Sequence, residues 1–381
     1  MLCWMLVSDS KFRPLSAANH SGANKRRDVG PLWLLMCWVG CLGTACGKES
    51  LGFGSIGILD EGVINDPANK SLRFDLLRFG LTQFCTEMQG RGVALKLQDG
   101  TPNLGRFFAT SCQSEVIDEA ARQTLVVRFE GRGYGWTNIT GRTGFQTRGL
   151  LEYAPDFQMH EGAMYIYFRP RNTESVNFES TLIESGVAQT GIAITGVQPN
   201  DVGRNIVQSQ LRRGFTVIRY SDRGETDFGM GVIPVGQRPL RPFQVVQSDK
   251  QTLDNDRTEV HSGQQDYIGG FVVQEDDQAL TLTLTLDGAP NLDVLLLAKG
   301  TGDSALESYI RLPGAAVPQA IPFAELLQQG QRYQRTIPVP KGAYYLLLDH
   351  SDRVGGAQPP VTALDDRAAR VDYLVQVGDR P

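Results

Sequence analysis

The clearest helical pattern in the chain lies between residues 71 and 89. Apolar side chains there, Phe74 and Phe84 among them, repeat every three or four residues, so they fall on one face of a helix. Ser71 can cap the N-terminus of this helix and Gly90 can end it. The pattern therefore predicts an amphipathic helix whose apolar face packs into a core.

The remaining apolar residues of the first half mostly form short β-branched and aromatic runs, which are typical of strands. Two stretches, 179–193 and 201–213, have helical spacing and predict further helices. Together these patterns predict an α+β domain over residues 58–244. The predicted strands are 93–97, 105–112, 124–130, 163–171, 215–220 and 229–236.

The segment "GRGYGWTNITGRTGF", residues 131–145, alternates glycine with aromatic residues. Such a composition rules out a helix. One interpretation is a binding loop that presents Tyr134 and Trp136. The other, which we favour, is a pair of strands with glycines at bulges or tight bends.

The second half of the chain has a different pattern of polar and apolar residues. Residues 245–266 are polar and predict a linker, and alternating runs then predict a β-sandwich domain over residues 267–378. One stretch, 321–330, is expected to be a helical insertion. The predicted strands are 267–273, 279–286, 292–298, 333–339, 343–349 and 371–377.

Two patterns in this half, "LTLTLTLDGAPNLDVLLLA" and "VPKGAYYLLLDHS", resemble the bacterial pre-peptidase C-terminal β-sandwich. That family shows a strand, an acidic turn into a second strand, and a late strand with Pro-x-Gly-x-Tyr-Tyr. The resemblance implies an accessory or binding module beside some other activity. It supplies no catalytic residue.

Length and charge add two constraints. A chain of 381 residues is too long for one ordinary core and favours two domains. The chain has a net charge of −5. Residues 1–45 contain five basic and two acidic side chains and so carry +3, which leaves −8 on residues 46–381. A body this acidic, without a stripe of basic side chains, is not expected to bind RNA or DNA.

The N-terminal residues have the layout of an export signal. Lys25, Arg26 and Arg27 precede the 15 residues Pro31–Ala45, which contain no charged side chain, and small residues then lead to Cys46. The apolar run is shorter than the ~20 residues that a membrane-spanning helix needs. A transmembrane anchor is therefore the weaker interpretation.

The sequence "LGTAC", which ends at Cys46, resembles the lipobox of bacterial lipoprotein signal peptides, in which the cysteine receives the lipid. Its large aliphatic residue stands one position earlier than is usual, and "WVGC", which ends at Cys41, is the alternative. Cys46 is preferred because polar sequence begins directly after it. The resemblance implies that residues 1–45 are a leader and signal peptide, with 1–24 explained by a start codon assigned too far upstream.

The same resemblance implies where the mature protein works. A lipidated Cys46 would carry more than one acyl chain, which suits stable anchoring in a membrane. Gly47 follows it, whereas lipoproteins kept at the inner membrane often have Asp there, so the outer membrane or cell surface is expected. Residues 46–57 would then be a polar tether, and "GFGSIG" within it is expected to be spacer instead of a nucleotide site.

Cys85 and Cys112 are the two cysteines that remain in the mature body. An exported chain meets an oxidising compartment, where an even number of cysteines favours disulfides. Cys85 is expected on the apolar helix face and Cys112 at a strand end, so a bond between helix and sheet is reasonable. Two buried free thiols are the alternative.

Residues for catalysis or metal binding are sparse. The strongest group is Asp156, His160 and Glu161, which with Tyr134 and Trp136 would form the site of an envelope hydrolase, the alternative function. A metal site needs three or four convergent ligands, so no metal site is predicted, and no cofactor motif is found. Further along, "DHS" at 349–351 cannot form a relay because adjacent strand residues point to opposite faces, and His350 is expected in an exposed turn.

These observations favour a non-catalytic lipoprotein, anchored in the cell envelope, that binds or holds a partner. The partner would be an envelope protein, a lipid or a polysaccharide. The sequence does not choose among them.

Overall fold

Strands dominate the computed structural model of the protein. They account for 61% of the described residues and helices for 15%, so the prediction of an α+β domain over 58–244 is wrong. The reason is that this domain is built on one large antiparallel sheet, to which helices add little. The structure describes residues 60–82, 84–96, 101–119, 122–137, 140–160, 163–172, 177–184, 216–218, 227–228, 240–245, 249–316, 323–360 and 367–380.

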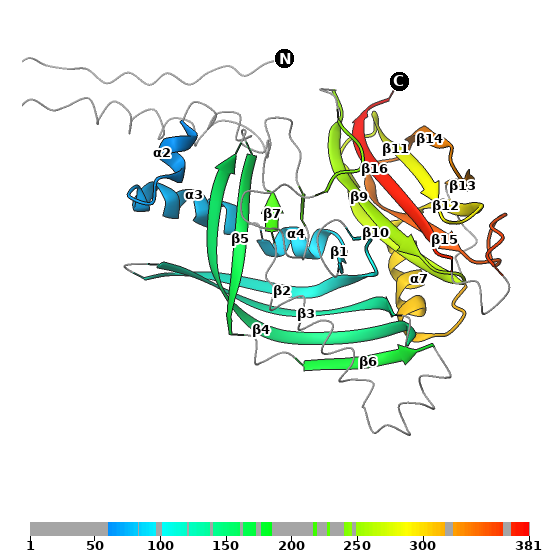
Figure 1. Ribbon diagram of the computed structural model, residues 1–381, viewed down its shortest axis with the longest axis horizontal. Helices are drawn as coiled ribbons and strands as arrows, with labels where there is room; N and C mark the ends of the chain where they lie inside the picture. The colour runs from blue at the N-terminus through cyan, green and yellow to red at the C-terminus, as the bar shows by residue number, and fades with distance from the viewer. Residues whose placement is uncertain are drawn as a thin grey trace, which may run out of the picture. The chain divides into compact units, whose positions relative to one another are not determined.

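The N-terminal sheet has eight strands in the order β1-β2-β3-β4-β5-β7-β8, with β6 paired to β4 (Figure 1). Its named pairings are all antiparallel. β2, β3 and β4 are consecutive in the chain and are neighbours in the sheet, as is common for antiparallel strands. The strands are β1 (Val93–Ala94), β2 (Gly105–Glu119), β3 (Arg122–Thr137), β4 (Gly141–His160), β5 (Ala163–Asn172), β6 (Asn177–Ile183), β7 (Thr216–Ile218) and β8 (Asp227–Phe228).

Helices cover one face of this sheet (Figure 1). Within the described residues they are α2 (Glu61–Asn65), α3 (Lys70–Thr82) and α4 (Phe84–Gly90), so the stretch predicted as one helix is two. The apolar face expected from the sequence is buried, as the pattern indicated. The core shared by helices and sheet includes Leu77, Leu81, Phe84, Met88, Leu125, Val127, Phe129, Leu151 and Phe168.

The sheet has a second, polar face. Along β3 the side chains of Leu125, Val127 and Phe129 are buried, whereas those of Arg128 and Glu130 are exposed. Successive side chains of a strand point to opposite faces. One face therefore packs on the helices, and the other presents charged groups.

The glycine and aromatic segment forms the predicted pair of strands, since β3 and β4 pair through it without interruption. The glycines make room for neighbouring rings and do not mark bulges within this pair. A Cβ atom on Gly131 would lie 2.5 Å from the Phe107 ring, and one on Gly133 would lie 2.7 Å from the Phe145 ring. Gly141, at the turn, has φ of 59°, a left-handed conformation that favours glycine.

The C-terminal part consists of two four-stranded sheets, β10-β15-β12-β13 and β14-β11-β16-β9. Their inner faces share a core of buried aliphatic and aromatic side chains, the arrangement of a β-sandwich. The strands are β9 (Gln251–Val260), β10 (Gln264–Val273), β11 (Gln278–Asp287), β12 (Asn291–Ala298), β13 (Phe323–Gln328), β14 (Arg332–Pro338), β15 (Gly342–His350) and β16 (Ala369–Asp379).

Three segments differ from the sequence expectation. The polar stretch 245–266 contains β9, an edge strand of the sandwich, and charged side chains are common on edge strands. The stretch 321–330 contains β13 and is not helical, because its backbone pairs with β12. The helix of this half is α7 (Lys299–Arg311), which the pattern did not predict.

Several other segments predicted from the sequence are either different in the structure or lie outside the described residues. The stretch 179–193 was expected to be helical, but its first residues belong to β6. The predicted helix 201–213 and strand 229–236, the tether 46–57 and Cys46 lie outside the described residues. The described residues, from 60 to 380, belong to one compact unit. No helix in the described part of the chain is long and apolar enough to cross a bilayer.

Candidate functional site

Tyr134 lies on β3 and not on a loop, and its side chain is buried. Its hydroxyl donates to Asp266 Oδ1 at 2.7 Å and accepts from the backbone N–H of Tyr267 at 2.7 Å. Burial, and then the Asp266 carboxylate, raise the pKa of Tyr134. These contacts commit the phenol to the packing between the N-terminal sheet and the sandwich.

Trp136 occupies the same face of β3, two residues further on. Its ring stacks on the ring of His261, with the centroids 3.2 Å apart and the planes 10° from parallel. His261 Nε2 in turn lies 3.1 Å from Glu259 Oε1, and this contact is the largest cause that lowers the pKa of Glu259. Trp136 is therefore also engaged within the protein, between β3 and the sandwich.

The residues proposed for a hydrolase do not come together. Asp156 is exposed and forms an ion pair with Arg73, Oδ1 to Nη2 2.9 Å, and His160 is exposed at the end of β4. Tyr134 pairs with Gly144, which is 12 residues before Asp156 on the same strand. At ~3.3 Å per residue this is roughly 40 Å along β4. Glu161 lies outside the described residues.

Cys85 and Cys112 are joined covalently. Cys85 on α4 and Cys112 on β2 form a disulfide with their Cα atoms 5.3 Å apart. Both side chains pack against the core between helices and sheet. The bond fastens the helical layer to the sheet.

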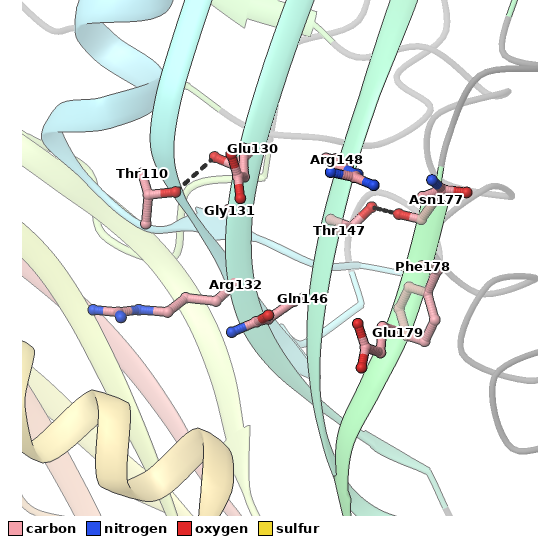
Figure 2. Close-up of a pocket in the computed structure, with 10 residues that line it drawn as sticks. All are labelled: Thr110, Glu130, Gly131, Arg132, Gln146, Thr147, Arg148, Asn177, Phe178 and Glu179. Atoms are coloured by element: carbon pink, nitrogen blue, oxygen red, sulfur yellow. Dashed lines mark hydrogen bonds between the residues drawn. The ribbon is translucent and has the colours of Figure 1, made fainter.

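A cavity lined by described residues opens on the polar face of the N-terminal sheet (Figure 2). Its volume is about 400 Å³. Residues directly opposite one another on antiparallel strands share a face, so the register places two neighbouring rows of side chains across β3, β4 and β6. The first row is Glu130, Arg148 and Asn177, and the second is Arg132, Gln146 and Glu179.

The two rows form a regular grid of polar groups. Adjacent strands are ~4.8 Å apart, and residues two apart along a strand are separated by roughly 7 Å. The patch is thus about 10 Å wide across its three strands. Its two arginines and two glutamates cancel in charge, and Gln146 and Asn177 add neutral donors and acceptors.

Most of these side chains have no partner within the described part of the protein. Glu130, Gln146, Arg148 and Glu179 make no side-chain hydrogen bond or ion pair there. Arg132 is the exception, because it forms an ion pair with Glu307 of α7. The cavity therefore offers donors and acceptors that a bound molecule can use.

The cavity lining contains two glutamates, Glu130 and Glu179, and two threonines, Thr110 and Thr147, and no histidine, cysteine or serine. Among the described residues no group of three or more histidine, cysteine, aspartate or glutamate side chains is placed to hold a metal ion.

Sequence reasoning did not single out these cavity residues. A signal was present in "RFEGR", residues 128–132, where every second residue is charged. This alternation indicates an exposed polar face on a strand. What it could not indicate is which residues of β4 and β6 lie opposite, because that depends on the register.

The comparisons with known proteins give no relative: no protein-family model matches the chain, and no curated protein matches it.

Proposed function

We propose that the protein is a non-catalytic binding lipoprotein of the cell envelope, and that the cavity on the polar sheet face holds a polysaccharide. One observation carries the binding role. Four polar side chains line one cavity and have no partner among the described residues: Glu130, Gln146, Arg148 and Glu179.

The choice of a polysaccharide rests on the chemistry of the lining. Sugar hydroxyls donate and accept hydrogen bonds, and the carboxylates, guanidinium groups and amides of the cavity offer both complements. The lining is neutral overall, with Arg132 and Arg148 against Glu130 and Glu179, which gives no advantage to a highly charged ligand.

The location rests on the N-terminal sequence. The basic residues before position 31, the apolar run and the lipobox-like "LGTAC" support a lipid on Cys46. Anchoring in the outer membrane would place the body beside the polysaccharides of the envelope. The body would serve there as a tethered holder and would not transform its ligand.

Sedimentation with isolated envelope polymers tests this proposal. Purified Cys46→Ser protein, which lacks the lipid site, is incubated with peptidoglycan sacculi or with lipopolysaccharide, and both the pellet and the released sugars are measured. We expect saturable sedimentation with one of these polymers and no release of soluble fragments. Absence of binding to both would contradict a polysaccharide ligand, and release of fragments would favour the hydrolase.

A further inference from the structure

A second cavity lies at the other end of the N-terminal sheet, and we propose that it binds a phosphate group. Its volume is about 270 Å³. Four arginines from three different elements line it: Arg73 of α3, Arg122 of β3, and Arg169 and Arg171 of β5. This inference does not depend on the polysaccharide site, because Arg122 precedes Glu130 by eight residues on β3, roughly 26 Å along the strand.

Arg73 provides the fixed wall of the cavity. Its Nη1 donates to the carbonyl of Ile64 at 2.8 Å, and its Nη2 donates to Asp156 Oδ1 and to the carbonyl of Phe157, both at 2.9 Å. The guanidinium carbon also lies 4.4 Å from the centre of the Phe157 ring. These contacts hold the positive charge in place without a ligand, so little order has to be gained on binding.

Arg171 and Arg122 bring two more positive charges close together. Arg171 Nη1 donates to Thr124 Oγ1 at 3.0 Å, and Arg122 forms an ion pair with Glu119. The hydrogen bond from Arg122 is the largest cause of the lowered pKa of Glu119, and the charge of Arg171 contributes to it. Glu119, which lies outside the lining, thus responds to the positive charge of both Arg122 and Arg171.

Arg169 is the arginine of the cavity whose hydrogen-bond donors are not used by the described residues. It is exposed on β5 and makes no hydrogen bond or ion pair with the described residues. A guanidinium group presents a planar fork of donors that matches the oxygen atoms of phosphate. Arg169 can therefore contact a ligand without giving up a contact that the fold needs.

The charge balance of the cavity selects an anion. Four arginines and one aspartate, Asp156, line the cavity, and with Glu119, the ion-pair partner of Arg122, the net charge is +2, although residues 46–381 as a whole carry −8. A local reversal of sign on an acidic body concentrates anions at that place. Because the surplus exceeds one charge, a phosphate group is favoured over a single carboxylate.

The phosphate could belong to a soluble molecule or to a lipid headgroup, and two measurements separate these sources. Calorimetric titration of the Cys46→Ser protein with inorganic phosphate and with pyrophosphate measures binding of soluble phosphate. Flotation of the same protein with phosphatidylglycerol vesicles, compared with phosphatidylcholine vesicles, measures binding to an anionic headgroup. Binding in either assay supports the site and names the source, whereas no binding in both would overturn it.

Two matched variants locate the binding. Arg169→Gln removes the arginine that has no hydrogen-bond or ion-pair partner among the described residues, and Arg128→Gln removes an exposed arginine of β3 outside the cavity. Loss of one charged hydrogen-bonding group should weaken binding roughly tenfold. We expect that loss for Arg169→Gln and unchanged affinity for Arg128→Gln, with the circular dichroism of both equal to that of the parent protein. Equal affinities of Arg169→Gln and parent, or equal weakening by both variants, would overturn the proposal.

Discussion

Arg106 of β2 and Asp266 of β10 form a two-point ion pair in the interior, with Nε–Oδ1 at 2.8 Å and Nη2–Oδ2 at 2.9 Å. Both side chains are almost completely buried. Tyr134 and Thr258 donate further hydrogen bonds to the same carboxylate at 2.7 and 2.8 Å. The pair joins the N-terminal sheet to the sandwich, so residues far apart in sequence depend on each other for stability.

Removal of the carboxylate should destabilise the protein strongly. Asp266→Ala leaves the Arg106 guanidinium buried without its counter-charge, and two hydroxyls lose their acceptor. Breaking a buried pair in this way costs about 3–5 kcal/mol. Urea denaturation of the variant should show this loss in the free energy of unfolding.

Asp287→Ala is the matched control for that experiment. Asp287 also pairs with an arginine, Arg370, but the distance is 3.8 Å and the aspartate side chain is 72% exposed. Exposed pairs contribute about 0–1 kcal/mol. Similar losses for Asp266→Ala and Asp287→Ala would contradict the role given to the buried pair.

Asp349 predicts a pH dependence of stability. Burial is the main cause that raises its pKa to about 6, although Ser351 donates a hydrogen bond to it at 2.8 Å. The unfolded carboxyl has a pKa of about 3.9, so the folded state binds more protons between these two values. The proton on Asp349 stabilises the folded state fully below pH ~4. This part of the free energy of unfolding, about 3 kcal/mol, is lost as the pH rises through ~6.

Asp349→Asn tests this by removing the titrating group while keeping an acceptor for Ser351. Melting curves at pH 4.5 and pH 7.5 should show that the variant gains stability relative to the parent at the higher pH. Asp352→Asn, an exposed neighbour, should leave the difference between the two pH values unchanged. A parent and an Asp349→Asn variant with the same pH dependence would contradict the prediction.

The disulfide gives a third prediction. Cys85 and Cys112 are 27 residues apart, and in the loop-entropy description a bond closing such a loop stabilises a protein by about 3–4 kcal/mol. Cys85→Ser should lower the free energy of unfolding by that amount, and Cys112→Ser should have the same effect. Mass spectrometry of native protein after thiol labelling should find neither residue labelled without reductant, and free thiols at both would refute the bond.

The sequence was most informative where one physical rule acts alone. The helical spacing of residues 71–89 and the alternation of Leu125–Glu130 both report a single buried face, and both faces are buried in the structure. It was least informative where pairing overrides propensity. The stretch 321–330 is rich in helix-forming residues, yet it contains β13 because β12 offers its backbone partners.

Tyr134 shows why the residues of a site could not be predicted from the sequence. A tyrosine among glycines resembles a binding residue, but its partner Asp266 lies 132 residues away. No local pattern reports such a contact. The cavity residues pose the same difficulty, because Gln146 and Glu179 are brought together only by the register of β4 and β6. The sequence could thus predict that the sheet has a polar face, but it could not predict which residues of neighbouring strands share the cavity.

The proposed anchor predicts a difference between two cysteines of the N-terminal segment. Cys46→Ser should release the protein from the membrane fraction and abolish its labelling with a palmitate analogue, because the lipid would have no attachment site. Cys41→Ser should remain in the membrane and keep the label. The reverse outcome would move the lipid to Cys41, and membrane retention of both without label would exclude a lipid anchor.

The central claim is that the cavity on the polar sheet face is where the protein binds its polysaccharide. The most direct measurement compares the affinity of Gln146→Ala, which truncates a cavity side chain, with that of Gln113→Ala, an exposed glutamine of β2 outside the cavity. Both are measured in the Cys46→Ser protein by sedimentation with the polymer that the parent binds. Loss of one or two hydrogen bonds predicts a roughly three- to tenfold weaker affinity for Gln146→Ala and no change for Gln113→Ala. Equal affinities of both variants and the parent would contradict the claim.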